Sequence, residues 1–522
     1  MQRRSLRLTA MLAVSLGSLH TGVQALPGVP PVRYTVTMTD PARHIFHVEL
    51  RARGDLDTIY LKMPRWMPGY YQIMDYARSV THLVARGEKG ARIACDSIDD
   101  HTWRLSGVRN RNYTVWYDVR TKRQFVASPY IDSAHAYILP EGVFLYEDGA
   151  ISRPVSVKLV FSRDWTKVAT GLDAIPGKDN EFQAPDFDVL YDCPILVGRL
   201  EELPSFRIHG IEHRFIGYDM GSFDRVAFMK NLEKAVRAAS AIIGDIPYRR
   251  YTFIAIGKGR GGIEHLDNTT VSFDGAQLQT PEGVNKMMSF LSHEYFHNFN
   301  VKRIRPLELG PFDYERENRT NLLWVSEGLS VYYEYLAIRR GGIIPDSTLL
   351  ENFEGNIDAY ENDPGRPYQS LQQASYETWS DGPFGRQGEK DDRSISYYDK
   401  GPVVGLLLDF AIRHDTHNAR SLDDVMRWLY REYYQQLHRG FTDAEFEQAC
   451  EQIAGTSLST VFEYVYTTRE LDYGTYLGYG GLRADITVDP ATGAKKYVLR
   501  RIEHPSAEQH RILESWLGDS AP

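Results

Sequence analysis

Cysteine is scarce in this chain: Cys95, Cys193 and Cys450 are spread over 522 positions. Three scattered thiols exclude a disulfide framework and a cysteine-based metal site. We expect all three to be small buried side chains. A Cys95–Cys193 bridge is the alternative if the protein is exported.

Clustered basic residues are also few. The formal net charge is −9, and bases gather only in short groups, such as Lys302, Arg303 and Arg305. A nucleic-acid-binding protein needs a basic face to neutralise phosphates. We therefore expect no nucleic-acid partner.

Long apolar stretches are missing beyond the N-terminus, so no membrane span is expected after signal removal. Residues 1–25 have the pattern of a secretory signal peptide, with Arg3 and Arg4 before the apolar stretch LTAMLAVSLGSL and with Val23-Gln24-Ala25 before the cleavage site. An N-terminal membrane anchor is the alternative, but the apolar run is shorter than a span. The sequence predicts an exported protein, periplasmic or secreted.

The chain is too long for a single core, and its hydrophobic periodicity changes once. Apolar residues alternate at period two in the segments 32–38, 46–52, 113–119 and 155–161. This pattern predicts a multidomain protein whose N-terminal domain, residues 26–205, is all-β and sandwich-like.

From residue 206 the spacing of the apolar residues becomes that of a helix. Apolar residues recur every three or four positions from Val226 to Ile243 and stop at Gly244. A strand over 250–257 and further helices over 281–299 and 321–340 follow. The sequence predicts an α+β, mainly helical second domain over residues 206–470.

The segment LSHEYFH contains the motif HExxH in the second of these helices. His293 and His297 are one helical turn apart, about 40° around the axis, so their imidazoles can share one metal ion. Glu294 is about 100° away from His293, beside such an ion without ligating it. The apolar stripe of the helix, which includes Leu291, lies on the opposite side, which argues against ordinary core histidines.

Two histidines leave a tetrahedral zinc ion short of a protein ligand. The segment LWVSEGLSVYYE supplies Glu327 in surroundings that do not favour an unpaired acid. A surface glutamate is the alternative. We expect one Zn²⁺ per chain, held by His293, His297 and Glu327. Glu334 is either a hydrogen-bond partner of a ligand histidine or an exposed side chain.

Several motifs in order resemble those of the glycyl-aminopeptidase family of zinc metallopeptidases, a family of the thermolysin-like clan. They are GGIEH at 261–265, HEYFHNFNVKRIRP, WVSEGLSVYYE, PGRPYQSLQQAS and SISYYDKG at 394–401. The resemblance covers about residues 30 to 480. It implies that the second domain has a thermolysin-like fold. The family ends in a PDZ domain, for which residues 471–522 are too few, so we expect a remnant of a PDZ-like module there.

The resemblance implies catalytic roles for two residues outside the ligand set. Glu294 would act as the general base, and Tyr398 would stabilise the oxyanion of the tetrahedral intermediate. A packed aromatic beside Tyr397 is the alternative for Tyr398. The protein is then expected to be an exported zinc aminopeptidase that acts on peptides.

The resemblance also implies a substrate-binding segment. Glu264 would bind the free α-amine, with Gly261, Gly262 and His265 beside it, and glycine or alanine would be favoured as the first residue. The alternative is that the glycines form a turn and Glu264 is solvated. For the whole protein, the alternatives are an endopeptidase on the same scaffold and a catalytically idle peptide-binding relative. The intact motifs argue against an idle relative.

Overall fold

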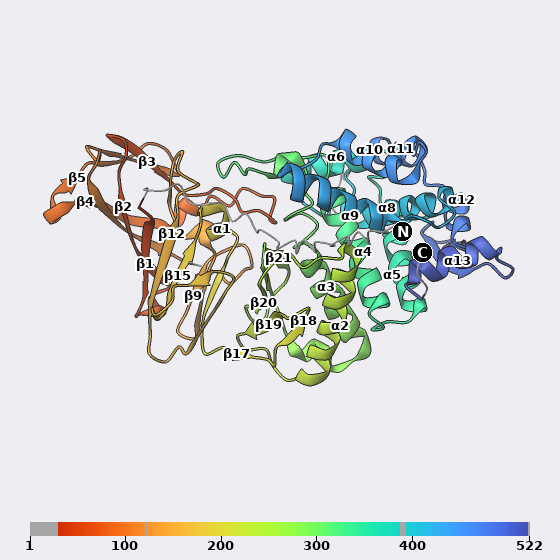
Figure 1. The fold of residues 1–522 in the computed structure, drawn as a ribbon, viewed down its shortest axis with the longest axis horizontal. Helices are drawn as coiled ribbons and strands as arrows, with labels where there is room; N and C mark the ends of the chain where they lie inside the picture. The colour runs from red at the N-terminus through yellow and green to blue at the C-terminus, as the bar shows by residue number, and fades with distance from the viewer. Residues whose placement is uncertain (1–29, 122, 387–392, 520–522) are drawn as a thin grey trace, which may run out of the picture.

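The computed structural model describes residues 30–121, 123–386 and 393–519. The expected signal peptide at 1–25 lies outside the described residues. The chain forms a β-rich part followed by a mainly helical part, and the strands and helices gather at opposite ends of the molecule (Figure 1). This arrangement confirms the fold class expected from the change in periodicity.

The four segments with alternating apolar residues are strands that lie next to one another in one sheet. Their inward residues form the core; those of β1, for example, are at most 2% exposed. The full sheet has eight strands. Their order is β14 (Asp173–Ala174), β15 (Glu181–Ala184), β12 (Val155–Phe161), β1 (Val32–Met38), β2 (Ile45–Arg53), β8 (Asn112–Arg120), β4 (Val80–Gly87) and β5 (Arg92–Ile93).

Two four-stranded sheets share their core with this large sheet. One is ordered β13 (Lys167–Thr170), β16 (Ile195–Gly198), β10 (His135–Ile138) and β9 (Tyr130–Ile131), and the other β11 (Tyr146–Glu147), β3 (Thr58–Lys62), β7 (Thr102–Ser106) and β6 (Cys95–Ser97). The short helix α1 (Phe187–Tyr191) begins at Asp186, whose side chain accepts a hydrogen bond from the Val189 amide. Asp192 ends this helix and faces the second part of the molecule.

A mixed sheet connects the two parts. Its order is β17 (Glu201–Glu202), β19 (Ile211–Gly217), β20 (Arg250–Ala255), β22 (Asn268–Val271) and β21 (Gly262–Glu264), with β18 (Phe206–Ile208) also paired to β19. Strands β19, β20 and β22 are parallel, whereas β21 runs antiparallel at the edge. The GGIEH segment therefore lies on an edge strand.

Helices cover the rest of the second part. Helix α2 is capped by the Asp224 side chain and ends at Gly244, whose φ of +83° suits glycine. The helices are α2 (Arg225–Ile243), α3 (Pro281–Phe296), a π-turn (Trp324–Gly328), α4 (Leu329–Arg340), α5 (Asp346–Glu361), α6 (Leu371–Tyr376), α7 (Thr378–Asp381), α8 (Tyr397–Asp415), α9 (Leu422–Leu429), a π-helix (Tyr430–Leu437), α10 (Asp443–Ala454) and α11 (Ser459–Tyr466). None of the helices in the described ranges has the length and apolar character that crossing a membrane requires.

The C-terminal segment packs on these helices. It consists of α12 (Tyr473–Tyr479), a hairpin of β23 (Leu482–Val488) and β24 (Lys495–Arg501), and α13 (Ala507–Leu517). The Trp516 indole donates a hydrogen bond to the Tyr332 hydroxyl, and the Leu499 amide donates one to Glu354. The expected relation of this segment to a PDZ module stays a prediction.

All three cysteines lie among the described residues and are free thiols. Cys193 and Cys450 are buried, and Cys95 is half-buried. The expected small buried role therefore fits two of the three, and the alternative bridge is not formed.

Candidate metal centre and substrate cleft

The two histidines of the HExxH motif lie side by side at the C-terminal end of α3. The Thr280 side chain caps the start of this helix, and His297, directly after its last residue Phe296, is the C-cap. The Nε2 atoms of His293 and His297 are 2.9 Å apart, and both residues are buried. The i, i+4 spacing thus places two nitrogen ligands at one point.

Glu327 reaches the same point from the π-turn that precedes α4. Its Oε2 atom lies 3.5 Å from His293 Nε2 and 3.2 Å from His297 Nε2. Burial raises the pKa of the Glu327 carboxyl, but the two histidines lower it by more, so the carboxylate stays ionised. Glu327 is therefore a buried carboxylate next to the histidines and not a surface residue.

The three atoms fit a zinc ion. Zinc–ligand bonds of about 2.0–2.1 Å in a tetrahedron place neighbouring ligand atoms about 3.3 Å apart. The measured separations of 2.9, 3.2 and 3.5 Å lie on both sides of that value. Histidine nitrogens and one carboxylate are also the donor set of many catalytic zinc sites, which leave a fourth position for water.

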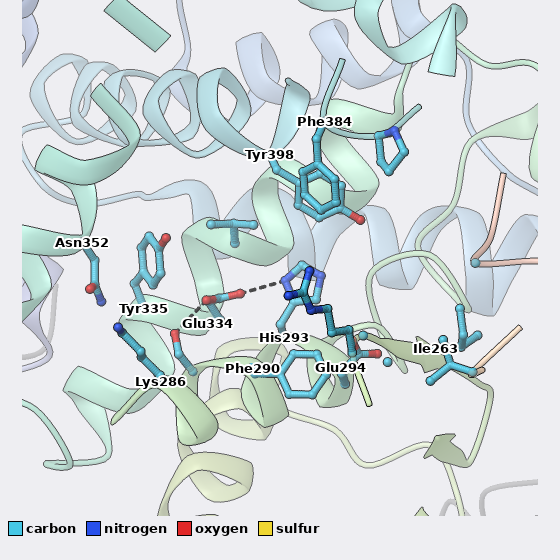
Figure 2. Close-up of a pocket in the computed structure, with 18 of the residues that line it drawn as sticks. Ile263, Lys286, Phe290, His293, Glu294, Glu334, Tyr335, Asn352, Phe384 and Tyr398 are labelled. Carbon is cyan, nitrogen blue, oxygen red and sulfur yellow. Dashed lines mark hydrogen bonds and ion pairs between the residues drawn. The ribbon is translucent and has the colours of Figure 1, made fainter. Parts of the chain in front are cut away.

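The outer nitrogens of both histidines have partners that turn Nε2 toward this point. His293 Nδ1 lies 2.8 Å from Glu334 Oε2 (Figure 2). His297 Nδ1 lies 2.8 Å from the carbonyl oxygen of Asn300, to which it donates. Such contacts fix the ring orientation of a metal ligand. Of the two interpretations left open for Glu334, the structure has the contact with a histidine.

Glu294 lies beside the three ligand atoms and lines the cleft. The Thr269 hydroxyl lies 3.4 Å from its Oε2 atom and donates to the nearer carbonyl oxygen of Ile263 at 3.0 Å. A Cβ atom at Gly262 would come within 2.5 Å of Oε1, so only glycine leaves room for this carboxylate. Burial raises the pKa of the Glu294 carboxyl to about 7, against the opposite effect of the two histidines.

Tyr398 approaches the same ligands from α8. Its hydroxyl donates a hydrogen bond to Glu327 Oε2 over 2.8 Å. A close contact between two glycines permits this approach: a Cβ atom at Gly328 would lie 2.7 Å from the Cα atom of Gly401. This contact was not predicted from the sequence, although Gly328 lies in the motif WVSEGLSVYYE and Gly401 in SISYYDKG.

Glu264 is buried at 4% exposure in the edge strand β21. No donor from the described part of the chain pairs with its Oε1 atom. The backbone of Gly69, from the β-rich part, covers this carboxylate closely enough that a Cβ atom there would lie 2.6 Å from Oε2. The alternative of a solvated Glu264 is excluded by this burial.

A cavity of about 1030 Å³ lies next to these groups. His293, Glu294, Tyr398, Gly261 and Gly262 line it, whereas His297, Glu327, Glu264 and His265 are buried and do not. Tyr398 and Phe384 lie on one side of His293, and Phe290 and Glu294 lie on the other (Figure 2). The β-rich part supplies Gly69, Tyr70, Tyr71, Gln72, Phe125 and Val126 to the wall.

His265 is turned away from this cavity. Its Nδ1 atom lies 3.1 Å from Asp192 Oδ1, in the β-rich part. The structure thus places His265 between the two parts of the molecule, away from the cleft, although it was expected in the substrate-binding segment beside Glu264.

Two family models match the sequence. Residues 33–199 match the Peptidase M61 N-terminal domain, and residues 286–404 match the M61 glycyl aminopeptidase model. Among curated proteins, the sequence search found no match.

Solved structures resemble most of the fold. A crystal structure of an aminopeptidase N family protein from Idiomarina loihiensis is 26% identical, with a TM-score of 0.83 over 88% of this chain and 79% of that chain. An M1 zinc metallopeptidase from Deinococcus radiodurans, solved as a mutant bound to a Tyr-Ser-Ala substrate, is 13% identical, with a TM-score of 0.53 over 85% of this chain and 95% of that chain. At this identity the second likeness concerns the fold alone.

Proposed function

We propose an exported aminopeptidase function for this chain, which belongs to the M61 glycyl aminopeptidase family of zinc metallopeptidases. The enzyme removes the first residue of a peptide when that residue is small, glycine or alanine. The N-terminal pattern of residues 1–25 supports export to the periplasm or the medium. The observation that carries the proposed chemistry is the spacing of the His293, His297 and Glu327 ligand atoms beside the Glu294 carboxylate.

One zinc ion per chain would be held by His293, His297 and Glu327. When bound, zinc acidifies a water molecule and polarises the carbonyl group of the scissile bond. Glu334 and Asn300 orient the two histidine rings for this ligand set.

Glu294 is the proposed general base. Its Oε2 atom lies 3.4 Å from the Thr269 hydroxyl, and Oε1 faces the space that Gly262 leaves open. In this role Oε1 accepts the proton of the attacking water and then delivers it to the nitrogen of the leaving amine. A carboxyl group with a pKa near neutrality is suited to both halves of this transfer.

Tyr398 is the proposed oxyanion donor. Its hydroxyl already lies at the edge of the ligand set, where it donates to Glu327. A small rotation would direct the same proton to the substrate oxygen, where negative charge develops in the transition state.

Glu264 is the proposed anchor of the substrate's α-ammonium group. Its carboxylate is buried next to the cleft wall, and Oε1 lacks a partner within the residues that the structure describes. A buried anion of this kind favours a substrate group that carries a positive charge and donates hydrogen bonds. Binding the free amine at a fixed distance from Glu294 would place the first peptide bond at the base.

The test compares alanyl amide with N-acetyl-alanyl amide as substrates of the purified protein. We expect rapid cleavage of the free amine only, loss of activity with a chelator and recovery with zinc. Glu264→Gln should reduce this preference and keep the zinc content. Equal cleavage of the two substrates by the wild type would replace the aminopeptidase with an endopeptidase. No cleavage of either by the zinc-loaded protein would favour an idle peptide-binding relative.

A further inference from the structure

The cavity extends well beyond the metal ligands along α3. One face of this helix borders it for about three turns, and the lining residues recur at helical spacing. They include Glu282, Asn285, Lys286, Ser289, Phe290 and His293. From His293 to Glu282 this face covers about 17 Å, at a rise of about 1.5 Å per residue. About five residues of an extended peptide span that length.

Two further helices border the same space with one face each. Their lining residues, also at helical spacing, include Glu334, Tyr335 and Ile338 of α4 and Thr348, Glu351 and Asn352 of α5. Asn352, Tyr335 and Lys286 lie on one side of His293, and Ile263 of the edge strand lies on the other (Figure 2). The space between α3, α4 and α5, here named the helical groove, therefore begins at the metal ligands and runs away from the proposed amine anchor.

The two ends of the cavity differ in exposure. At the amine end the Glu264 carboxylate is buried, and Gly69 covers it closely. At the far end of the helical groove the side chains of Glu282 and Lys286 are 76% and 77% exposed, so this end opens to solvent. A peptide whose amine is held at Glu264 therefore has room to continue along the helical groove.

Two side chains of the helical groove are free to bind a peptide backbone. Asn285 and Asn352 are part-exposed, and neither carboxamide has a hydrogen-bond partner among the described residues. Lys286, by contrast, is engaged in an ion pair with Glu282 at 2.8 Å. A carboxamide both donates and accepts hydrogen bonds, as a peptide group does. The groove thus offers one such group on α3 and one on α5.

We propose that the helical groove binds the leaving part of oligopeptide substrates, with Asn285 and Asn352 as hydrogen-bond partners of its backbone. This inference rests on the proposed function, in which Glu264 fixes the first residue and the metal ligands lie at the first peptide bond. Asn285 lies about 12 Å from His293 along the axis of α3, a distance that about four extended residues span. Peptides of about five residues or more reach it, whereas dipeptides and tripeptides do not. Because the contacts are made with backbone groups, the groove selects for length and not for sequence.

The test measures kcat/KM for alanine-first peptide amides of two to eight residues. Amidation keeps the charge of the last residue constant along the series. We expect kcat/KM to rise about tenfold between the dipeptide and the hexapeptide amide, as two hydrogen bonds are gained, and to stay constant beyond it. A kcat/KM that is independent of length, or that falls with length, overturns the inference.

The double variant Asn285→Leu/Asn352→Leu tests the two side chains. Leucine has a similar volume without polar atoms, so the ratio of kcat/KM for the hexapeptide to that for the dipeptide should fall about tenfold. Asn231→Leu is the matched control. Asn231 on α2 is also part-exposed but does not line the cavity, so the ratio should stay at the wild-type value. A ratio that is preserved in the double variant overturns the inference, as does an equal fall in the control.

The wild-type enzyme also separates this inference from the proposed function. If it cleaves alanyl amide and N-acetyl-alanyl amide equally, the proposed function fails together with the inference. If it prefers the free amine but kcat/KM does not depend on peptide length, the inference alone fails.

Discussion

At the metal end of the cleft, formed by His293, His297 and Glu327, the supporting contacts come from neighbouring helices and loops of the same part of the molecule. At the amine end, formed by Glu264 and its surroundings, they come from the other part: Gly69 covers the carboxylate, and Asp192 holds the residues that follow it. One end is built by contacts within a domain, the other by the joining of two domains.

The two ends of the cleft should therefore differ in function: the metal end in the chemical step and the amine end in substrate binding. Changes at the metal end should act on metal binding or on kcat, because the proposed mechanism places the groups there at the reacting atoms. Changes at the amine end should act on KM and on the preference for a free amine, because they alter binding before the reaction. The β-rich part is then a component of the substrate site and not only a neighbour of it.

The largest effect is expected at the metal end from Glu294→Gln. The amide cannot accept the proton of the attacking water, so kcat should fall by about 10²–10⁴-fold. Zinc content should stay at one per chain, because Glu294 lies beside the ligand atoms without joining them. Metal analysis and kcat on the same preparation check this. An active variant, or one without zinc, contradicts the assignment.

Tyr398→Phe should have the next largest effect. Loss of the oxyanion donor should lower kcat by about 10²–10³-fold with little change in KM, because the donor matters only as charge develops. Tyr397→Phe is the matched control, since that buried hydroxyl pairs with Thr378 over 3.0 Å and does not contact the ligand set. Equal losses in the two variants would assign Tyr398 a packing role.

A smaller effect at the same end is expected from Glu334→Gln. Removing the charge next to His293 Nδ1 should weaken zinc binding by about 10–100-fold, measured by competition with a chelator. At saturating zinc most of the activity should return. Glu351→Gln is the control, because this exposed acid also lines the cleft. A zinc affinity that is unchanged in Glu334→Gln would limit Glu334 to its hydrogen bond with Ser289.

The metal end could be predicted from the sequence because its geometry is local. The spacing of His293 and His297 fixes their separation once a helix forms, and the apolar surroundings of Glu327 indicated its burial. The predicted helix extended to residue 299, whereas α3 ends at Phe296 with His297 as its cap. That difference leaves the relation between the two histidines intact. The alternating strands were predictable for the same reason, since period two is a local pattern.

The amine end could not be predicted in the same way. Gly69 and Glu264 are far apart in the sequence, and neither position carries a pattern that names the other. Asp192 was missed because a single acid after a short helix has no distinctive neighbours. His265 was assigned to the substrate-binding segment because its contact with Asp192 is equally long-range and cannot be predicted from the sequence. The short strands β10 and β16 were also missed, since all their residues are buried and alternation is absent.

The smallest effect, and the one that isolates the amine end, is expected from Gly69→Ala. Gly69 has a φ of +92°, and an added Cβ atom would lie 2.6 and 2.8 Å from the two oxygens of Glu264. Gly90→Ala is its matched control, because Gly90 has a similar φ of +82° but no atom within 4 Å of the added Cβ. Each substitution should cost about 1 kcal/mol of stability from the left-handed backbone.

Only Gly69→Ala should also displace the Glu264 carboxylate, so KM for an alanyl anilide should rise about fivefold, equivalent to about 1 kcal/mol of binding. Thermal unfolding measures the shared backbone cost, and steady-state kinetics measure the difference between the two variants. If KM rises equally in both, Gly69 is a turn residue and nothing more. If it rises in Gly69→Ala alone, with zinc content and kcat preserved, a backbone atom of the β-rich part sets the position of the amine anchor. Recognition of the substrate would then depend on how the two domains are joined.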